Sequence, residues 1–266
     1  MKGRVLIIAG SDSGGGAGIQ ADIKAVSAMG AYAATAVTAV TVQDTTCVHA
    51  VHDVPPDIIR RQIEVVLDDI GADAIKIGMV GSVAAGEAIL AGLADAPGVP
   101  VIVDPVLVAT SGDSLGRGEV ADFLREQLIP LASVVTPNLP ELEALSGLKL
   151  GGDETIKKAA KALLDLGAQA VLAKGGHGDG QTLTDLLVEA DGKAVTFENQ
   201  RIATMSTHGT GCTLSSALAA GIAQDMPLSK ATGRAIAYVH EAIASAPGFG
   251  RGHGPVNHLV RSSFSD

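Results

Sequence analysis

Residues 4–18 read Arg-Val-Leu-Ile-Ile-Ala-Gly-Ser-Asp-Ser-Gly-Gly-Gly-Ala-Gly, an apolar run that passes directly into a glycine-rich loop. The apolar part does not alternate with polar residues, which is typical of a parallel strand covered on both faces. Similar short runs recur along the chain and alternate with helical patterns. We predict strands at Arg4–Ala9, Ala34–Val42, Val48–Val51, Ala74–Ile77, Val101–Val103, Val134–Val135 and Ala170–Leu172. This order predicts an α/β protein, a three-layer α/β/α sandwich with a mostly parallel central sheet.

The segments between these runs carry helix signals. One buried stripe at helical spacing runs through Ile59, Ile63, Val66, Leu67 and Ile70. Near the end of the chain we predict a hairpin, Leu183–Glu189 with Ala194–Phe197, and two helices, Gly211–Ala223 and Leu228–Ala244. No linker, repeat or low-complexity segment divides the chain, so we expect residues 1–266 to form a single domain.

The composition excludes several classes of function. The 266 residues carry a net charge of −10 and only 2% are aromatic, so we expect no nucleic-acid partner. The two cysteines, Cys47 and Cys212, lie far apart in the sequence, which favours a reducing compartment, and no Cys/His spacing indicates zinc. The first apolar run is too short for a signal peptide or a membrane span. We therefore predict a cytoplasmic enzyme without a membrane partner.

A second glycine-rich motif carries the clearest functional signal. Residues 208–213 read His-Gly-Thr-Gly-Cys-Thr and lead into a predicted helix. Backbone N–H groups and the helix dipole can stabilise an anion there, such as a transferring phosphoryl group, with Gly209, Thr210 and Gly211 as the cradle. Cys212 lies in the first turn, where the same field favours a thiolate of lowered pKa. The alternative is a plain glycine turn with Cys212 as a small buried residue.

Polar side chains follow several of the predicted strands. Because ligands of open α/β sheets bind beyond the carboxyl ends of the strands, these side chains are expected to meet at one edge. Gln43 offers a donor and an acceptor that complement an aminopyrimidine edge, or it is a solvated strand end. Asp104 is a possible magnesium ligand or a loop cap, and Lys174 a possible phosphate ligand or a solvated lysine. Asn138 and Glu141 are either a helix capping box or groups near the metal. Together with the anion cradle, they indicate a kinase of small molecules.

The loop after the first strand allows a different interpretation. Gly16-x-Gly18-x-x-Ala21 formally matches a dinucleotide-binding fingerprint, with Asp44 as its acid, which would make the protein a nicotinamide-dependent dehydrogenase. That fingerprint needs its first glycine directly after the strand, whereas here further residues intervene after Gly10. We therefore favour a loop that covers a substrate.

From end to end, the chain resembles the bacterial hydroxymethylpyrimidine/phosphomethylpyrimidine kinases of thiamine biosynthesis, which have the ribokinase-like fold. The matching runs are Ile8-Ala-Gly-Ser-Asp12, Gly14-Gly-Gly-Ala-Gly-Ile-Gln-Ala-Asp22, Lys76-Ile-Gly-Met79, Thr136-Pro-Asn-Leu-Pro-Glu141, Lys174-Gly-Gly-His177, Thr207-His-Gly-Thr-Gly-Cys-Thr213 and Gly252-His-Gly-Pro-Val-Asn-His258.

The resemblance implies a role for each matching residue. Gln43 would bind the pyrimidine, in a pocket lined by Gly10, Met79 and Val106, with Asp22 as a further pocket residue. Lys174 would hold the transferring phosphate and Gly209–Gly211 would form the anion hole. Cys212 stands where most related sugar kinases carry a catalytic aspartate. ATP would be the donor, and Mg²⁺ would be supported by Asp104, Asn138 and Glu141. The resemblance also implies a homodimer or a larger homo-oligomer.

Two alternatives share this pocket. Some relatives with the same cysteine motif are pyridoxal kinases, and pyridoxal is also a six-membered N-heterocycle with a hydroxymethyl group. A pyrimidine-binding regulator that has lost phosphoryl transfer is the non-catalytic alternative, and intact Lys174 and Cys212 argue against it.

Overall fold

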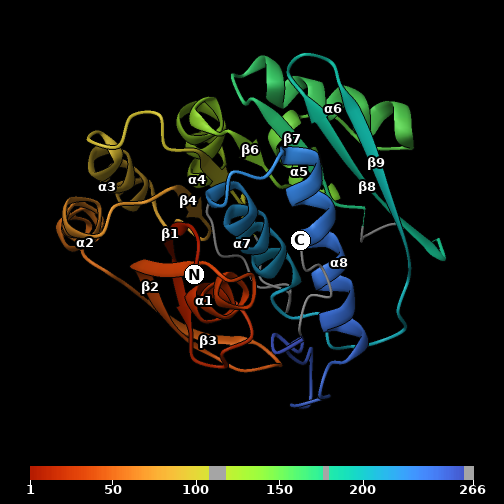
Figure 1. Ribbon diagram of the computed structural model, residues 1–266, viewed down its shortest axis with the longest axis horizontal. Coiled ribbons are helices and arrows are strands. Elements are labelled where there is room, and N and C mark those ends of the chain that lie inside the picture. The colour runs from red at the N-terminus through yellow and green to blue at the C-terminus, as the bar shows by residue number, and fades with distance from the viewer. Residues whose placement is uncertain (108–117, 176–179, 261–266) are drawn as a thin grey trace.

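The computed structural model describes residues 1–107, 118–175 and 180–260. Within these residues, one nine-stranded sheet has the order β3-β2-β1-β4-β5-β6-β7-β8-β9 (Figure 1). The strands are β1 (Arg4–Asp12), β2 (Tyr32–Gln43), β3 (Val48–Asp53), β4 (Ala74–Ile77), β5 (Val101–Val103), β6 (Val134–Val135), β7 (Ala170–Ala173), β8 (Thr182–Glu189) and β9 (Ala194–Gln200).

The sheet has a parallel centre with antiparallel edges. Strands β2, β1, β4, β5, β6 and β7 pair in parallel, β3 is antiparallel to β2, and β8 and β9 form the predicted hairpin beside β7. The predicted α/β class and mostly parallel sheet are thus confirmed. Because β1 lies between β2 and β4, the chain direction across the sheet reverses at β1, where such folds bind their ligands.

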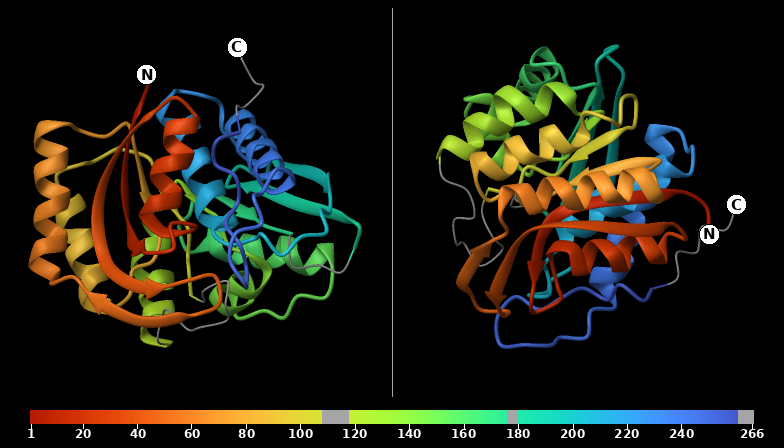
Figure 2. Two further views of the ribbon diagram at one scale, coloured as in Figure 1. Left: turned by 90° about the horizontal axis from the view of Figure 1, so that it is seen from below. Right: turned by 90° about the vertical axis from the view of Figure 1, so that its left-hand side faces the viewer.

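Helices cover both faces of the sheet, as the two views of Figure 2 show. One face is covered by α2 (Pro56–Asp69), α3 (Val83–Leu93), α4 (Gly118–Phe123), α5 (Leu139–Ser146) and α6 (Asp153–Asp165), and the other by α1 (Gly18–Ala28), α7 (Thr210–Ala223) and α8 (Leu228–Ala244). A π-helical turn (Leu124–Leu128) and a 3₁₀ turn (Ile129–Leu131) follow α4.

The hydrophobic pattern explains why α2 packs as it does. Ile59 and Ile63 of its predicted stripe are fully buried against α3 and the sheet. Gly71 then ends the helix with a φ of 74°, a left-handed conformation that favours glycine. Among the helices that the structure describes, none is long and apolar enough to cross a membrane.

Strand β1 extends past its apolar run, which the sequence pattern did not predict. The pairing with β2 shifts register between Ala9 and Ser11 and then continues to Asp12. The shift lets polar residues stay in the ladder, so the strand carries Asp12 to the carboxyl edge of the sheet.

Candidate active site

A cavity of about 660 Å³ opens at the carboxyl edge of the parallel strands. All the predicted site residues except Asp22 line it. They are Gly10, Gln43, Met79, Asp104, Val106, Asn138, Glu141, Lys174, Gly209, Thr210, Gly211 and Cys212. The residues that follow the strands, which were predicted to meet at one edge of the sheet, therefore surround a single cavity. Residues 108–117, which follow Val106 and Leu107 in the chain, lie outside the described residues.

Asp104 and Lys174 form an ion pair in the cavity wall. Lys174 Nζ donates to Asp104 Oδ1 at 3.0 Å, and Thr136 Oγ1 donates to the same oxygen at 3.2 Å. Burial works to raise the pKa of Asp104, but the charges of Lys174 and Lys76 outweigh it and hold the pKa below its usual range. Burial works to lower the pKa of Lys174, and Asp104 and Glu141 reverse that effect, so both partners remain charged.

The first turn of α7 lies beside this pair. Gly209 precedes the helix with a φ of 76°, and a side chain there would collide with the Gly16 carbonyl, so glycine is required on both counts. At Gly211 a Cβ atom would lie 3.2 Å from Lys174 Nζ, so the lysine ammonium lies against the start of the helix. The helix N-terminus and Lys174 together make a positive corner that suits a phosphoryl group.

Cys212 differs from the sequence-based expectation. Burial raises the pKa of its thiol to about 12, and Asp22 and Asp104 act in the same direction against the charge of Lys76. The predicted lowering of the pKa is therefore wrong, because burial and the two carboxylates outweigh the charge of Lys76 and the hydrogen bond from Gly18 N. The thiol lies in the cavity wall in its protonated form.

Asn138 and Glu141 form the capping box and also line the cavity. Asn138 Oδ1 accepts from Glu141 N, and Glu141 Oε2 accepts from Asn138 N, both at 2.8 Å. Burial raises the pKa of Glu141 to about 7; the charge of Lys174 opposes this effect and that of Asp104 adds to it. The helix-capping role is thus present, and it leaves the carboxyl group at the cavity surface with oxygen atoms of the kind that Mg²⁺ binds.

Asp22 lies beneath the cavity and not in its lining. Its carboxylate forms an ion pair with Lys76 at 2.8 Å and accepts from Ser216 Oγ at 2.7 Å, and both charged side chains are fully buried. The prediction that Asp22 belongs to the pocket is corrected by this geometry. Its side chain faces β4 and α7 because that is where its partners lie, so it supports the floor of the site.

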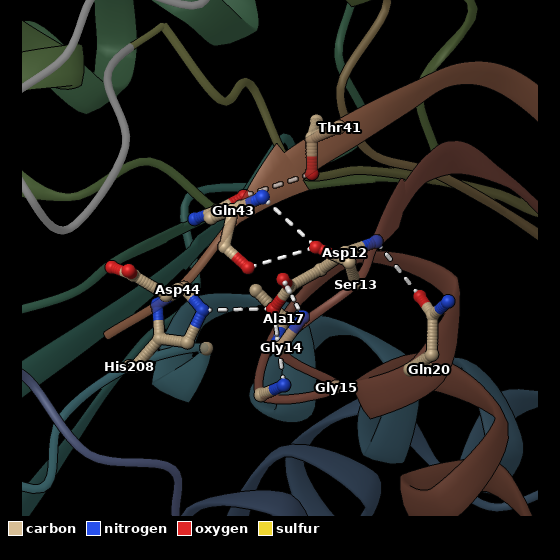
Figure 3. A network of polar contacts seen from close by, with 12 residues as sticks. Asp12, Ser13, Gly14, Gly15, Ala17, Gln20, Thr41, Gln43, Asp44 and His208 are labelled. Carbon is tan, nitrogen blue, oxygen red and sulfur yellow. Dashed lines mark hydrogen bonds and ion pairs between the residues drawn. The ribbon is translucent and has the colours of Figure 1, made fainter. Parts of the chain in front are cut away.

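A buried pair that the sequence analysis did not identify shapes the glycine-rich loop. His208 Nε2 lies 2.9 Å from Asp12 Oδ2, and the Asp12 carboxylate accepts N–H groups from Gly14, Gly16 and Ala17 (Figure 3). Burial favours a raised pKa for Asp12, but His208 and these backbone donors lower it. The loop is therefore wrapped around a charged carboxylate at the end of β1. In the sequence, Asp12 stands out as a polar residue after an apolar run, and both Asp12 and His208 lie in runs that match the family.

Gln43 lies at the mouth of the cavity next to this loop. Its Oε1 accepts from Thr41 Oγ1 at 3.2 Å, and its backbone exchanges two hydrogen bonds with Ser13 Oγ, as Figure 3 shows. Asp44, the acid of the dinucleotide alternative, does not line the cavity and pairs with His49 instead. Of the loop 14–18, Ala17 and Gly18 line the cavity.

Known proteins resemble this chain over almost its whole length. A hydroxymethylpyrimidine/phosphomethylpyrimidine kinase of Rhizobium meliloti is 48% identical over 264 residues, covering 98% of both chains. Among solved structures, a phosphomethylpyrimidine kinase of Clostridium difficile is 41% identical with a TM-score of 0.80, covering 91% of this chain and 100% of that one. An ADP complex of Bacillus subtilis pyridoxal kinase is 36% identical with a TM-score of 0.90, covering 97% and 98%.

The model of the phosphomethylpyrimidine kinase family matches residues 12–257, a span that begins at Asp12 and includes every residue of the cavity wall discussed above except Gly10. The resemblance that the motifs predicted is confirmed, and the chain belongs to the phosphomethylpyrimidine kinase family.

Proposed function

We propose that this protein transfers the γ-phosphoryl group of ATP to 4-amino-5-hydroxymethyl-2-methylpyrimidine and then to the resulting monophosphate, as in thiamine biosynthesis. The observation that carries the proposal is that one cavity joins the amide of Gln43 to the positive corner of Lys174 and the α7 N-terminus. The named relatives at 48% and 41% identity support the same activity.

The substrate would lie between Gln43 and the cradle. The Gln43 amide would bind the aminopyrimidine edge, while Met79 packs against Gly10 and shapes an apolar wall beside it. Gly209–Gly211 and Lys174 would stabilise the negative charge that moves with the phosphoryl group. The same corner would receive the monophosphate in the second reaction.

The oxygen donors near Lys174 fit a magnesium ion. Asp104 and Glu141 are buried carboxyl groups in the cavity lining, and Asn138 adds an amide oxygen, which is a set of hard ligands. When bound with ATP, Mg²⁺ would neutralise charge on the β- and γ-phosphates. The structure of the Bacillus subtilis neighbour contains ADP, which supports ATP as the donor.

We propose that Cys212 is a neutral thiol at rest and accepts the substrate hydroxyl proton as a thiolate, which forms only after its own proton has passed to solvent. Its thiol is protonated in the buried wall, and Gly18 N–H donates to its sulfur. Phosphoryl transfer through a loose transition state needs little help from a base before the leaving group departs. The raised pKa keeps the thiolate rare, and it makes the thiolate a strong base for the hydroxyl proton once it has formed.

The likeness to pyridoxal kinases makes pyridoxal the second candidate substrate. ADP release measured with the pyrimidine alcohol, its monophosphate and pyridoxal separates the two. We expect two ADP per pyrimidine alcohol and a higher kcat/KM for it than for pyridoxal. A single ADP per alcohol, or a preference for pyridoxal, would overturn the proposal.

We also propose a cytoplasmic homodimer, on the resemblance of the motifs to this family of metabolic kinases. Light scattering coupled to gel filtration measures the mass in solution, for which we expect twice the 26.7 kDa of one chain. A monomeric mass would contradict this part of the proposal and leave the kinase activity untouched.

A further inference from the structure

Three potential metal ligands meet on the turn between β2 and β3, directly after Gln43. They are Asp44, Cys47 and His49, and their ligand atoms all lie within 4.8 Å of one another. His49 Nε2 is 3.0 Å from Asp44 Oδ2, and Cys47 Sγ is 3.6 Å from both ring nitrogens of His49. Across residues 1–107, 118–175 and 180–260, no other group of three His, Cys, Asp or Glu side chains comes this close.

These separations are close to those of a tetrahedral zinc site. With Zn–S of about 2.3 Å and Zn–N of about 2.0–2.1 Å, tetrahedral angles place sulfur and nitrogen about 3.6 Å apart, and nitrogen and carboxylate oxygen about 3.4 Å apart. The observed Sγ–Nε2 distance of 3.6 Å agrees with this value, the Nε2–Oδ2 distance of 3.0 Å is somewhat shorter, and the sulfur and the carboxylate oxygen lie within 4.8 Å of each other. Binding an ion therefore requires the carboxylate to move outward and the imidazole ring to turn. His49 is half exposed, so its ring can turn to direct either nitrogen at an ion.

The turn already holds the carboxylate in place. Asp44 Oδ1 accepts from Thr46 N at 2.7 Å, from Thr46 Oγ1 at 2.6 Å and from Cys47 N at 3.2 Å. This leaves Oδ2 directed at His49. For the carboxylate, the loss of side-chain freedom that metal binding requires has therefore largely occurred before an ion arrives.

We propose that Asp44, Cys47 and His49 form a binding site for a borderline-soft divalent cation of the zinc class, with the fourth position open to water. A thiolate and an imidazole favour zinc over Mg²⁺, which prefers oxygen ligands. The site is separate from the oxygen donors Asp104 and Glu141, because none of its three side chains lines the active-site cavity. The proposal does not depend on the identity of the kinase substrate.

An ion here would link the two sides of the turn next to the active site. Thr45, between the ligands, accepts from Arg251 N at 3.1 Å and from Gly252 N at 3.2 Å, and its carbonyl accepts from His253 N at 2.8 Å. Gln43 precedes Asp44 in the chain and is tied to the glycine-rich loop through Ser13. A bound cation would therefore hold the segment that joins the pocket mouth to residues 251–253.

The test is a titration of the metal-free full chain with Co²⁺ and Zn²⁺ in excess Mg²⁺. We expect one Co²⁺ per chain, with the visible d–d absorption of a tetrahedral site and a thiolate charge-transfer band, both displaced by Zn²⁺. Cys47→Ser should remove the charge-transfer band. Removing a group that only hydrogen-bonds to a metal ligand already costs about 10–100-fold in metal affinity. Cys47→Ser and His49→Gln remove ligands themselves, so they should weaken Zn²⁺ binding by at least that factor.

His52→Gln is the matched control, because His52 is an exposed histidine on the same strand β3 and is not part of the cluster. It should bind Zn²⁺ as the wild type does. Hydrogen exchange of the peptide covering residues 43–49 should slow on Zn²⁺ addition in the wild type and in the control, and not in Cys47→Ser.

Two results would overturn the proposal. One is the failure of the wild-type chain to retain Zn²⁺ in excess Mg²⁺. The other is a charge-transfer band that survives in Cys47→Ser, which would place the ion at Cys212. Equal thermal melting of the metal-free variants and wild type shows that the comparison is made between folded proteins. Kinase activity of the metal-free variants is measured separately, so its loss or retention does not decide the metal site.

Discussion

His208 and Asp12 are 196 residues apart in the chain, yet their side chains meet at 2.9 Å in the wall of the active site. Asp12 ends the strand at the sheet's reversal point, and His208 opens the turn that leads into α7. A side chain at Gly16 would collide with the His208 ring, so the loop closes directly over the pair. The pair thus fixes the glycine-rich loop to the phosphate cradle.

Breaking this pair should impair both stability and catalysis. Asp12→Asn removes the charge that three backbone N–H groups and His208 share, and loss of a buried partner costs about 1–3 kcal/mol. Because the pKa of Asp12 is lowered on folding, its contribution is present above the ordinary value of 3.8 and is lost as pH falls below it. Between pH 7 and pH 3, the free energy of unfolding measured with urea should therefore fall less in Asp12→Asn than in the wild type. An equal loss in both proteins would contradict the assignment.

Gln43 should govern the affinity for the heterocycle and not that for ATP. Gln43→Leu leaves polar atoms of the substrate without a partner, at about 1–3 kcal/mol, so KM for the pyrimidine should rise roughly tenfold or more. Steady-state kinetics with each substrate varied in turn measures this, with Gln20→Leu as a control, since Gln20 Oε1 accepts from Asp12 N at the end of β1 but Gln20 does not line the cavity. An unchanged KM for the pyrimidine in Gln43→Leu would place the pocket elsewhere.

Glu141 should make the magnesium requirement depend on pH. Its carboxyl group has a pKa raised to about 7, and a protonated carboxyl group binds Mg²⁺ poorly, so the Mg²⁺ concentration for half-maximal rate should fall as pH rises through 7. Glu141→Ala should need more Mg²⁺ and lose this dependence, and chelator should abolish turnover in both. Full turnover of the wild type in chelator would remove Asp104 and Glu141 from the mechanism.

Glu141 should also change the free energy of unfolding with pH, in the direction opposite to Asp12. A carboxyl group whose pKa rises on folding stabilises the protein below its ordinary value of 4.5, and this contribution is lost as pH rises through about 7. Glu141→Gln should thus gain stability relative to wild type between pH 5 and pH 8, as measured by denaturant unfolding.

The two cysteines should differ in reactivity. Burial raises the pKa of Cys212 to about 12, so its alkylation by iodoacetamide should stay slow at pH 8 and accelerate up to the highest usable pH, whereas Cys47 on the exposed turn should react first. Cys212→Ser should still lower kcat by roughly 10²–10⁴-fold, because a serine hydroxyl is far less acidic than the thiol and yields much less of the anion that accepts the proton. Mass spectrometry of the alkylated peptides and the variant's kcat measure the two effects. A near wild-type rate would leave catalysis to Lys174 and Gly209–Gly211.

The buried pair of Asp22 and Lys76 should stabilise the fold without contacting substrate. Asp22→Asn leaves the Lys76 ammonium buried without its counter-charge, and breaking such a pair costs about 3–5 kcal/mol. Replacing both residues, Asp22→Leu with Lys76→Met, removes the uncompensated charge and should recover most of the stability. Denaturant unfolding of the three proteins tests this. A single variant as stable as the wild type would show that the pair is not charged.

The sequence predicted the sheet and the edge where the site lies because both follow from local patterns. Short apolar runs rich in β-branched residues, such as Val101–Val103, are typical of buried strands, and the residues after parallel strands share one edge. The places where prediction failed depend on contacts between distant segments. Asp22 was expected in the pocket from the family resemblance alone, but its direction is set by Lys76 on β4 and Ser216 on α7. The pKa of Cys212 depends on burial and on carboxylates from two other elements.

The distance along the chain between Asp12 and His208 also sets when the site can exist. At translation rates of about 5–20 residues per second, the 196 residues between them take roughly 10–40 s to synthesise. During that time β1 can already pair with β2 and β4, but the Asp12 carboxylate, which organises the glycine-rich loop, lacks its partner because His208 has not yet been synthesised. The nascent protein must therefore keep the end of its central strand accessible until α7 arrives, and catalytic competence is among the last properties that the growing chain acquires.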